Sequence, residues 1–221
     1  MATGARHRFE AWWVPVLLLL VVGAIAGAGL DGLRWLHYLC KPAATLLVIA
    51  RVTTAAPGAY RRWVFIGLLC SLAGDICLML PVDAFVPGLA AFLLAHLAYI
   101  VAFARGVRGK ILVLAATLLA AYAVANLYGL WPHLPAALIG PVVAYTGVLA
   151  TMAALAIARG AMPPADGTRA RRAALGAVLF VASDSLLAWD RFAGPWPWAI
   201  AGVLLTYYAA QWLIAESTQP R

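Results

Sequence analysis

Residues 85–104 read FVPGLAAFLLAHLAYIVAFA, a run of twenty residues that contains no Lys, Arg, Asp or Glu. The hydrocarbon core of a bilayer is about 30 Å thick, and an α-helix needs roughly 20 apolar residues to cross it. The run therefore predicts a membrane-spanning helix. The rest of the chain can be divided by the same criterion.

The whole chain shares this apolar character, because 65% of its 221 residues are hydrophobic, only 11% are charged and the mean hydropathy is +0.92. About a quarter of the residues in a soluble domain are charged, so that class is excluded. Breaks at Pro, Gly and charged residues define eight approximate spans: 12–30, 33–52, 62–80, 85–104, 111–129, 135–158, 171–189 and 197–215. We expect an all-α polytopic membrane protein with eight transmembrane helices in one bundle, which forms a single domain over residues 1–221.

Basic residues lie almost entirely in one set of alternate connections between these spans. Of the sixteen Lys and Arg residues, only Arg34 and Arg191 lie in the other set, and Lys41 lies inside the second span. Cytoplasmic loops carry such an excess of Lys and Arg, so both termini are predicted to be cytoplasmic. The same distribution accounts for the net charge of +8, and no nucleic acid partner is expected.

The remaining sequence features bear on location and connections. The Ala- and Arg-rich composition is typical of a bacterial protein, which makes the inner membrane the expected location. Residues 161–168 form the longest polar connection and are expected to be a flexible cytoplasmic loop. The three cysteines lie inside apolar runs and give no sign of a disulfide framework. The sequence leaves the oligomeric state open.

Two of the eight carboxylates, Asp75 and Asp184, lie inside predicted spans. A charged group inside a membrane costs a few kcal/mol even on lenient scales, so such residues usually face the bundle interior and mark function. Each Asp lies thirteen residues after an arginine, Arg62 or Arg171, on helices that run in the same direction. The two should therefore lie at one level, in the outer half of the bilayer. A helix–helix hydrogen bond or a buried ion pair is the alternative role for each.

The spacing of the two aspartates also suggests an internal repeat. An offset of 109 residues relates Asp75 to Asp184 and Tyr99 to Tyr208. We interpret it as a four-plus-four parallel repeat, with coincidence among apolar helices as the alternative.

Further polar residues are candidates to support the aspartates or to bind substrate. They are Lys41, His96, Tyr99, Ser183, Tyr208 and Gln211. Lys41 is expected near the level of the aspartates, although its amine could instead extend to the membrane interface. A lone His in an apolar helix, such as His96, is often a hydrogen-bonded structural residue. Tyr145 and Thr146 are weaker candidates that suit packing or helix–helix bonding.

Recognised motifs of other chemistries are missing from the sequence. It has no His/Cys/carboxylate cluster at zinc spacing, no glycine-rich phosphate loop and no Gly-x-Ser-x-Gly elbow. We therefore expect neither a metal nor an organic cofactor. Two aspartates held close together in a low dielectric would share a proton near neutral pH, which suits acid–base catalysis.

Several segments together resemble the lysoplasmalogenase family, the YhhN-like membrane hydrolases. These are residues 71–79 (SLAGDICLM), 85–99, 176–184 (GAVLFVASD) and 207–211 (YYAAQ). The resemblance runs from the Lys41-Pro42 pair to Gln211. It implies an eight-helix membrane enzyme that hydrolyses the vinyl ether bond of a lysophospholipid, the lysoplasmalogen, to a fatty aldehyde and glycerophospho-ethanolamine or -choline. The catalytic aspartates of the family carry over onto Asp75 and Asp184.

The implied reaction fits the chemistry of two carboxylates. A vinyl ether is cleaved when its far alkene carbon is protonated and water captures the resulting oxocarbenium ion. A protonated Asp and an ionised Asp could supply the general acid, the general base and the stabilising charge. A small proton-coupled transporter or channel that uses the same Asp pair is the alternative function. An intramembrane aspartyl protease is less well supported, because Leu72-Ala73-Gly74-Asp75 lacks the first glycine of the usual Gly-x-Gly-Asp pattern.

Overall fold

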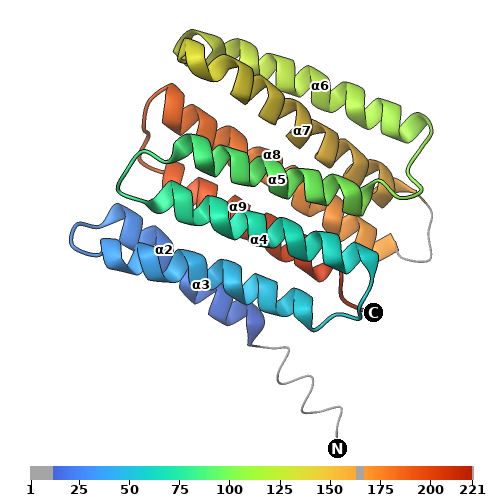
Figure 1. Ribbon diagram of the computed structural model, residues 1–221, viewed down its shortest axis with the longest axis horizontal. Coiled ribbons are helices and arrows are strands. Elements are labelled where there is room, and N and C mark those ends of the chain that lie inside the picture. Colours follow the sequence, from blue (N-terminus) through green and yellow to red (C-terminus); the bar gives the residue numbers. More distant parts are fainter. Residues whose placement is uncertain (1–11, 163–166, 221) are drawn as a thin grey trace, which may run out of the picture.

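The computed structural model describes residues 12–162 and 167–220, and every regular element in these ranges is helical (Figure 1). In chain order the elements are α2 (Trp13–Gly29), α3 (Arg34–Thr53), α4 (Ala59–Met79), α5 (Phe85–Phe103), α6 (Lys110–Leu130), the short 3₁₀ helix η1 (Trp131–His133), α7 (Ala136–Ala161), α8 (Gly167–Phe192) and α9 (Ala199–Glu216). The all-α class is confirmed, and each predicted span corresponds to one α-helix.

The helix ends differ from the predicted span limits mainly where charged residues occur. Helix α8 begins at Gly167 and ends at Phe192, several residues outside the predicted 171–189. Arginine has a high helix propensity, so a helix continues past the apolar segment that a hydropathy criterion detects. The expected loop 161–168 is correspondingly shorter: Ala161 ends α7, Gly167 begins α8, and residues 163–166 lie outside the described part of the chain.

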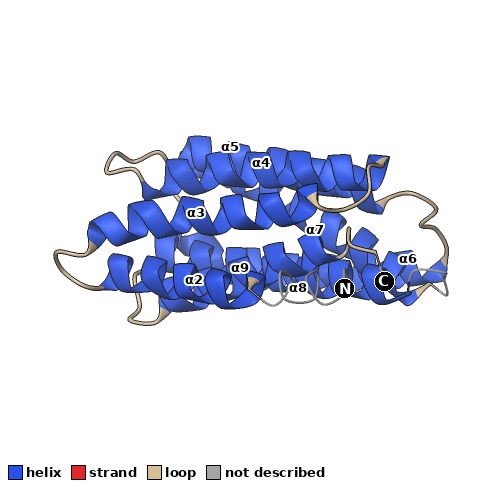
Figure 2. Ribbon diagram, turned by 90° about the horizontal axis from the view of Figure 1, so that it is seen from below, coloured by secondary structure: helices blue, strands red, loops and turns tan. Residues whose placement is uncertain are grey.

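The helices form a bundle in which antiparallel neighbours lie side by side (Figure 1). Helices α3, α4 and α5 lie in one layer, and α2, α9 and α8 lie in the other (Figure 2). Helix α9 also packs against α3 and α4, while α7 joins the layers by packing on both α5 and α8. Helix α6 lies at one side of the bundle against α7 (Figure 1). The α2–α3, α4–α5 and α8–α9 connections meet at the same end of the bundle.

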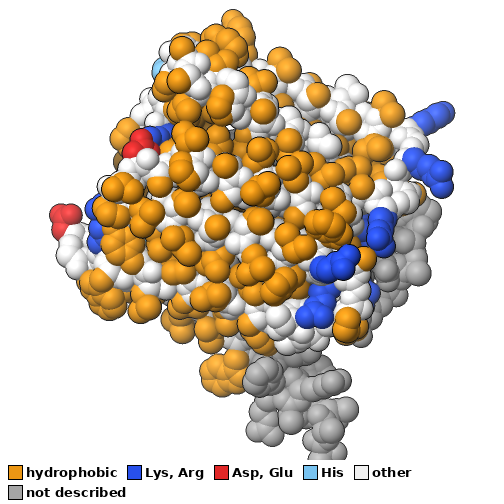
Figure 3. All heavy atoms as spheres, in the orientation of Figure 1, with side chains coloured by type: hydrophobic (Ala, Val, Ile, Leu, Met, Phe, Trp, Pro, Cys, Tyr) orange, Lys and Arg blue, Asp and Glu red, His pale blue; other side chains and the backbone are white. Residues whose placement is uncertain are grey.

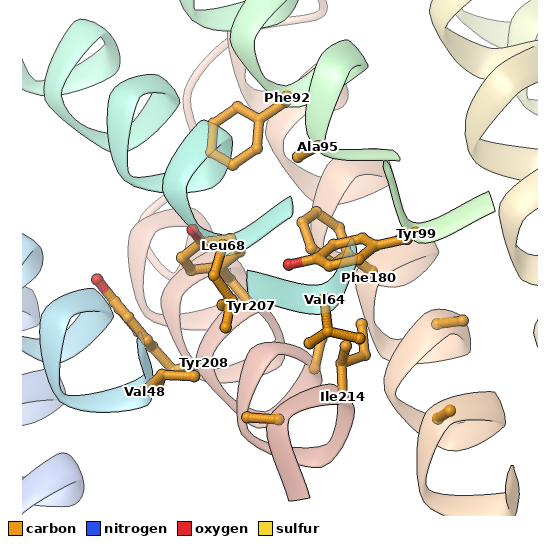
Figure 4. Packing of buried hydrophobic residues seen from close by; sticks show 14 of the residues in the cluster. Val48, Val64, Leu68, Phe92, Ala95, Tyr99, Phe180, Tyr207, Tyr208 and Ile214 are labelled. Carbon is orange, nitrogen blue, oxygen red and sulfur yellow. The ribbon is translucent and has the colours of Figure 1, made fainter. Parts of the chain in front are cut away.

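Aromatic rings fill the centre between the layers (Figure 4). Phe92 of α5 and Phe180 of α8 contact each other and Tyr207 of α9 edge to face, and Tyr99 of α5 contacts Phe180 in the same way. Small residues on α4 make room for these rings: a Cβ on Gly74 would lie 2.6 Å from the Phe92 ring. Gly74 therefore permits the close approach of α5 to α4.

The outer surface is apolar and suits a lipid environment. Six of the described helices, α4 to α9, are long and apolar enough to cross a membrane. Helix α2 is apolar but only 17 residues long, and α3 contains charged residues that lower its hydropathy. The exact number of eight membrane crossings thus stays a prediction, as does the four-plus-four repeat. On the face shown in Figure 3, hydrophobic side chains cover the middle, and most of the Lys and Arg side chains gather at the end opposite the α2–α3 connection.

Because α8 packs closely against α9, we expect one methyl group added at Gly176 to lower the stability of the protein. A Cβ on Gly176 would lie 2.8 Å from the carbonyl oxygen of Ala210, whereas a Cβ on Gly147 in α7 would meet nothing within 4 Å. We expect Gly176→Ala to lower the free energy of unfolding by about 1–3 kcal/mol, a typical cost of overpacking. Gly147→Ala, the matched control, should be neutral or slightly stabilising. Thermal unfolding in detergent measures both, and equal melting temperatures would contradict this view of the α8–α9 contact.

Candidate active site

Asp75 is buried among partners from two other helices, α3 and α9. The residue lies on α4 and is 1% exposed. The Thr45 hydroxyl of α3 donates a hydrogen bond of 2.6 Å to Asp75 Oδ2, and the Tyr207 hydroxyl of α9 donates one of 2.8 Å to the same oxygen. The Lys41 ammonium lies 3.6 Å from Asp75 Oδ1. Two donors and a cation therefore surround this carboxylate, and Lys41 is directed to Asp75 rather than to the membrane interface.

The other predicted polar residues of α5 and α9 reach Asp75 only indirectly. Gln211 donates to the Tyr207 hydroxyl at 3.1 Å and accepts a hydrogen bond of 2.8 Å from the Tyr99 hydroxyl. Tyr208 donates to the backbone carbonyl of Lys41 at 2.6 Å. These residues hold α9 against α3 and α5, and they fix the position of the Tyr207 hydroxyl that contacts the carboxylate.

Asp184 has a different environment on α8. Tyr145 of α7 donates a hydrogen bond of 2.5 Å to Asp184 Oδ2. His96 of α5 is fully buried, and its Nε2 lies 3.9 Å from the same oxygen. Among the described residues neither ring nitrogen of His96 has a hydrogen-bond partner, and the ring packs edge to face against Tyr145 and Phe180. No Lys or Arg of the described chain lies within 4.0 Å of Asp184.

Both aspartates line one cavity of about 360 Å³, here called the aspartate cavity. Lys41, Ser183 and Tyr207 also line it. The hydroxyl of Ser183 donates to the backbone carbonyl of Val203 at 3.1 Å, so this residue joins α8 to α9. The cavity reaches the end of the bundle where the α2–α3, α4–α5 and α8–α9 connections meet. Lining residues at that end are Arg34, His37, Pro81 and Asp190.

A second, mostly apolar cleft adjoins Asp184 between α5, α6, α7 and α8. It encloses about 80 Å³ and is called the apolar cleft below. Residues that line both hollows are Leu78, Phe92, Asp184 and Leu187. Asp184 thus lies where the aspartate cavity, whose lining mixes charged and apolar residues, meets the apolar cleft.

The arrangement suits proton transfer inside an apolar bundle. The two carboxylates face a common space but have unequal surroundings, which allows them to hold different protonation states. Among the described residues, no three His, Cys, Asp or Glu side chains are grouped so that they could hold a metal ion. The candidate chemistry therefore rests on the aspartates and the hydroxyl groups around them.

The profile of the YhhN family matches residues 36–218, which include α4 to α9 and all but the first two residues of α3. The chain belongs to the YhhN family. Curated relatives cover nearly all of it. Lysoplasmalogenase TMEM86B of Sus scrofa is 38% identical over 96% of this chain and 91% of its own, and Lysoplasmalogenase TMEM86B of Homo sapiens is 36% identical over 93% and 85%. A protein named lysoplasmalogenase from Mycobacterium bovis is 35% identical over 81% and 72%. No solved structure matches the chain significantly.

Two contacts of this candidate site were underestimated or missed from the sequence. Tyr145 is a weaker candidate from the sequence, suited to packing or helix–helix bonding, and the helix–helix bond that it makes is to Asp184 itself. Thr45 was not considered, yet it donates to Asp75. Thr45 lies four residues after Lys41 and therefore on the same face of α3, which is the one signal in the sequence that could have identified it.

Because Lys41 and Asp75 form a buried ion pair, we expect the effects of substituting them on stability to be coupled. Lys41→Met removes the cation and leaves the carboxylate of Asp75 buried without charge compensation, which typically costs about 3–5 kcal/mol. The added substitution Asp75→Asn removes that charge and should restore part of the lost stability. Thermal unfolding of the two variants in detergent measures this coupling. A double variant no more stable than Lys41→Met would contradict the pairing.

Proposed function

We propose that this protein hydrolyses the vinyl ether bond of lysoplasmalogens, releasing a fatty aldehyde and glycerophospho-ethanolamine or -choline. Relatives named lysoplasmalogenase support this activity, because they match the chain over most of its length and of theirs. The observation that carries the mechanism is that Asp75 and Asp184 line one cavity in unequal environments. No observation on the described residues favours transport over hydrolysis.

The surroundings of the two aspartates support different roles. Asp75 receives two hydrogen bonds and lies beside Lys41, and this set of partners stabilises a carboxylate. Asp184 receives one hydrogen bond, from Tyr145, and borders the apolar cleft. A less compensated carboxyl group in an apolar setting retains its proton more readily. We therefore assign Asp184 as the general acid and Asp75 as the ionised partner.

The reaction then proceeds in balanced steps. Asp184 gives its proton to the alkene carbon that is distal to the ether oxygen, and the carbon beside the oxygen becomes an oxocarbenium ion. The carboxylate of Asp75 stabilises this cation and accepts a proton from the water that attacks it. The hemiacetal collapses to the aldehyde as the glycerol oxygen leaves with a proton from Asp75, and Asp184 is reprotonated from the aldehyde-forming hydroxyl through water. Glycosidases use a similar pair of carboxyl groups around an oxocarbenium-like transition state.

The orientation in the membrane is part of the proposal. The distribution of Lys and Arg supports cytoplasmic termini, and the Ala- and Arg-rich composition supports a bacterial inner membrane. Arg6, Arg8 and Arg221, which contribute to that count, lie outside the described residues. The mouth of the aspartate cavity, lined by Arg34 and Asp190, then faces the exterior. Substrate would enter from the outer leaflet.

Asparagine substitutions test the two aspartates. Asp75→Asn and Asp184→Asn keep the side-chain size but cannot exchange a proton at neutral pH. Each should lower the rate of aldehyde release from lysoplasmalogen by about 10²–10⁴-fold, the usual contribution of a general acid or base. Melting temperatures measured in parallel separate catalysis from folding. Near-normal rates in both variants would refute the two-aspartate mechanism, and a loss that merely follows unfolding would indicate a structural role.

Aldehyde release should also continue in the presence of a chelator. The described residues offer no group of three metal-ligating side chains, so the proposed proton transfers need no divalent ion. The measurement is the rate before and after treatment with EDTA. Loss of activity with the chelator, followed by recovery with one specific divalent ion, would overturn this prediction.

A further inference from the structure

We propose, on the basis of the function above, that a single lysophospholipid occupies both hollows at once, with Arg34 binding its phosphate and the apolar cleft binding the first carbons of its chain. The scissile bond then lies beside Asp184, where the two hollows meet. Arg34 becomes a specificity-determining residue that selects a phosphate-bearing head group.

Arg34 lies at the mouth of the aspartate cavity without a carboxylate partner among the described residues. It is exposed, and no carboxylate of the described chain lies within 4.0 Å of it. Arg191, the other basic residue predicted on this side of the membrane, donates to Asp83 Oδ2 at 2.7 Å. That hydrogen bond holds the pKa of Asp83 below its usual value. Arg34 is therefore available to an anion from outside the chain, and guanidinium groups bind phosphate in a bidentate manner.

The other charges at the mouth fit the rest of a zwitterionic head group. Asp190 lines the same end of the cavity as Arg34. Asp190 thus supplies a negative charge for the ammonium group that is attached to the phosphate. Arg34 and Lys41 are seven residues apart on α3, which is about 10 Å along the helix axis. This length leaves room for the glycerol between the phosphate and the carboxylates deeper in the cavity.

The apolar cleft suits the beginning of a hydrocarbon chain. Its lining includes Leu119 of α6 and Leu149 and Ala150 of α7. With about 80 Å³ it has room for only the first few carbons. Helix α6 buries only Ala115 and Leu130 along its length, so it lies at the lipid-facing side of the bundle. The rest of the chain therefore extends past α6 into the bilayer, and the cleft gives a lateral route for substrate from the membrane.

Binding of two stable analogues tests the head-group contact. A 1-alkyl lysophosphoethanolamine, which has a saturated ether, resists the proposed hydrolysis, and a 1-alkylglycerol of equal chain length lacks the phosphate. Arg34→Gln should weaken binding of the phosphate-bearing analogue about tenfold and leave binding of the alkylglycerol unchanged, since a charge-assisted contact is lost. Arg191→Gln, the matched control, should bind both as wild type does. With lysoplasmalogen, Arg34→Gln should raise KM with little change in kcat.

Filling the apolar cleft tests the position of the chain. Ala150→Phe places a ring in the cleft and should weaken binding of both analogues at least fivefold, because both carry the same chain. Ala144 lies exposed on the same helix and outside the lining of the cleft. Ala144→Phe should therefore leave binding unchanged.

The results separate this inference from the proposed function. If wild-type protein releases no aldehyde but binds the phosphate-bearing analogue in an Arg34-dependent manner, the proposed activity fails and the lysophospholipid site stands. If wild-type protein releases aldehyde while Arg34→Gln binds and reacts as wild type does, the activity stands and the phosphate site is overturned. An equal loss for both analogues in Arg34→Gln, or no binding of the phosphate-bearing analogue to wild type, also overturns it.

Discussion

The charge of a carboxylate buried inside an apolar helix bundle must be compensated by hydrogen-bond donors or a cation. In this bundle the carboxylate of Asp75 has both. Its partners Lys41, Thr45 and Tyr207 come from two helices other than its own. An ion pair in such a setting adds little net stability, but the loss of one partner is costly. The relative positions of α3, α4 and α9 are therefore tied to a single charged group. The hydrogen bonds of Gln211 and Tyr208 extend the same constraint to α5 and to the backbone of α3.

Asp184 follows Asp75 by 109 residues, and its surroundings differ from those of Asp75. Under the predicted repeat, Ala150 and Ala154 correspond to Lys41 and Thr45, so the second half of the chain lacks both the cation and the hydroxyl donor. Among the described residues, the one hydrogen-bond donor to Asp184 is instead Tyr145. The two carboxyl groups thus have unlike environments. Such a difference is what a reaction that needs one protonated and one ionised carboxyl group requires.

The sequence predicted the elements better than the contacts between them, and the reason is physical. Hydropathy reports transfer into lipid, so it located each helix. It underestimated the length of α8, because the arginines at the start of α8 continue the helix beyond the apolar segment. Intramembrane charge singled out Asp75, Asp184 and Lys41 without showing which side chains meet. Those contacts depend on how α3, α7 and α9 pack around the aspartates. This explains why Thr45 was missed and Tyr145 was ranked low.

The two hollows also bear on how water takes part in the proposed hydrolysis. An oxocarbenium ion must be captured by a water molecule, and water must otherwise be scarce around the reacting carbons for the carboxyl groups to act strongly. The aspartate cavity has polar groups among its lining residues from Asp75 to its mouth, whereas the lining of the cleft that begins at Asp184 is mostly apolar. Water then approaches the cation from the side of Asp75, which is the group assigned to accept its proton. On the opposite side, the proposed acid Asp184 meets the alkene carbon where the chain enters the apolar cleft. The polarity of the two hollows and the roles assigned to the two aspartates therefore require the same orientation of the substrate.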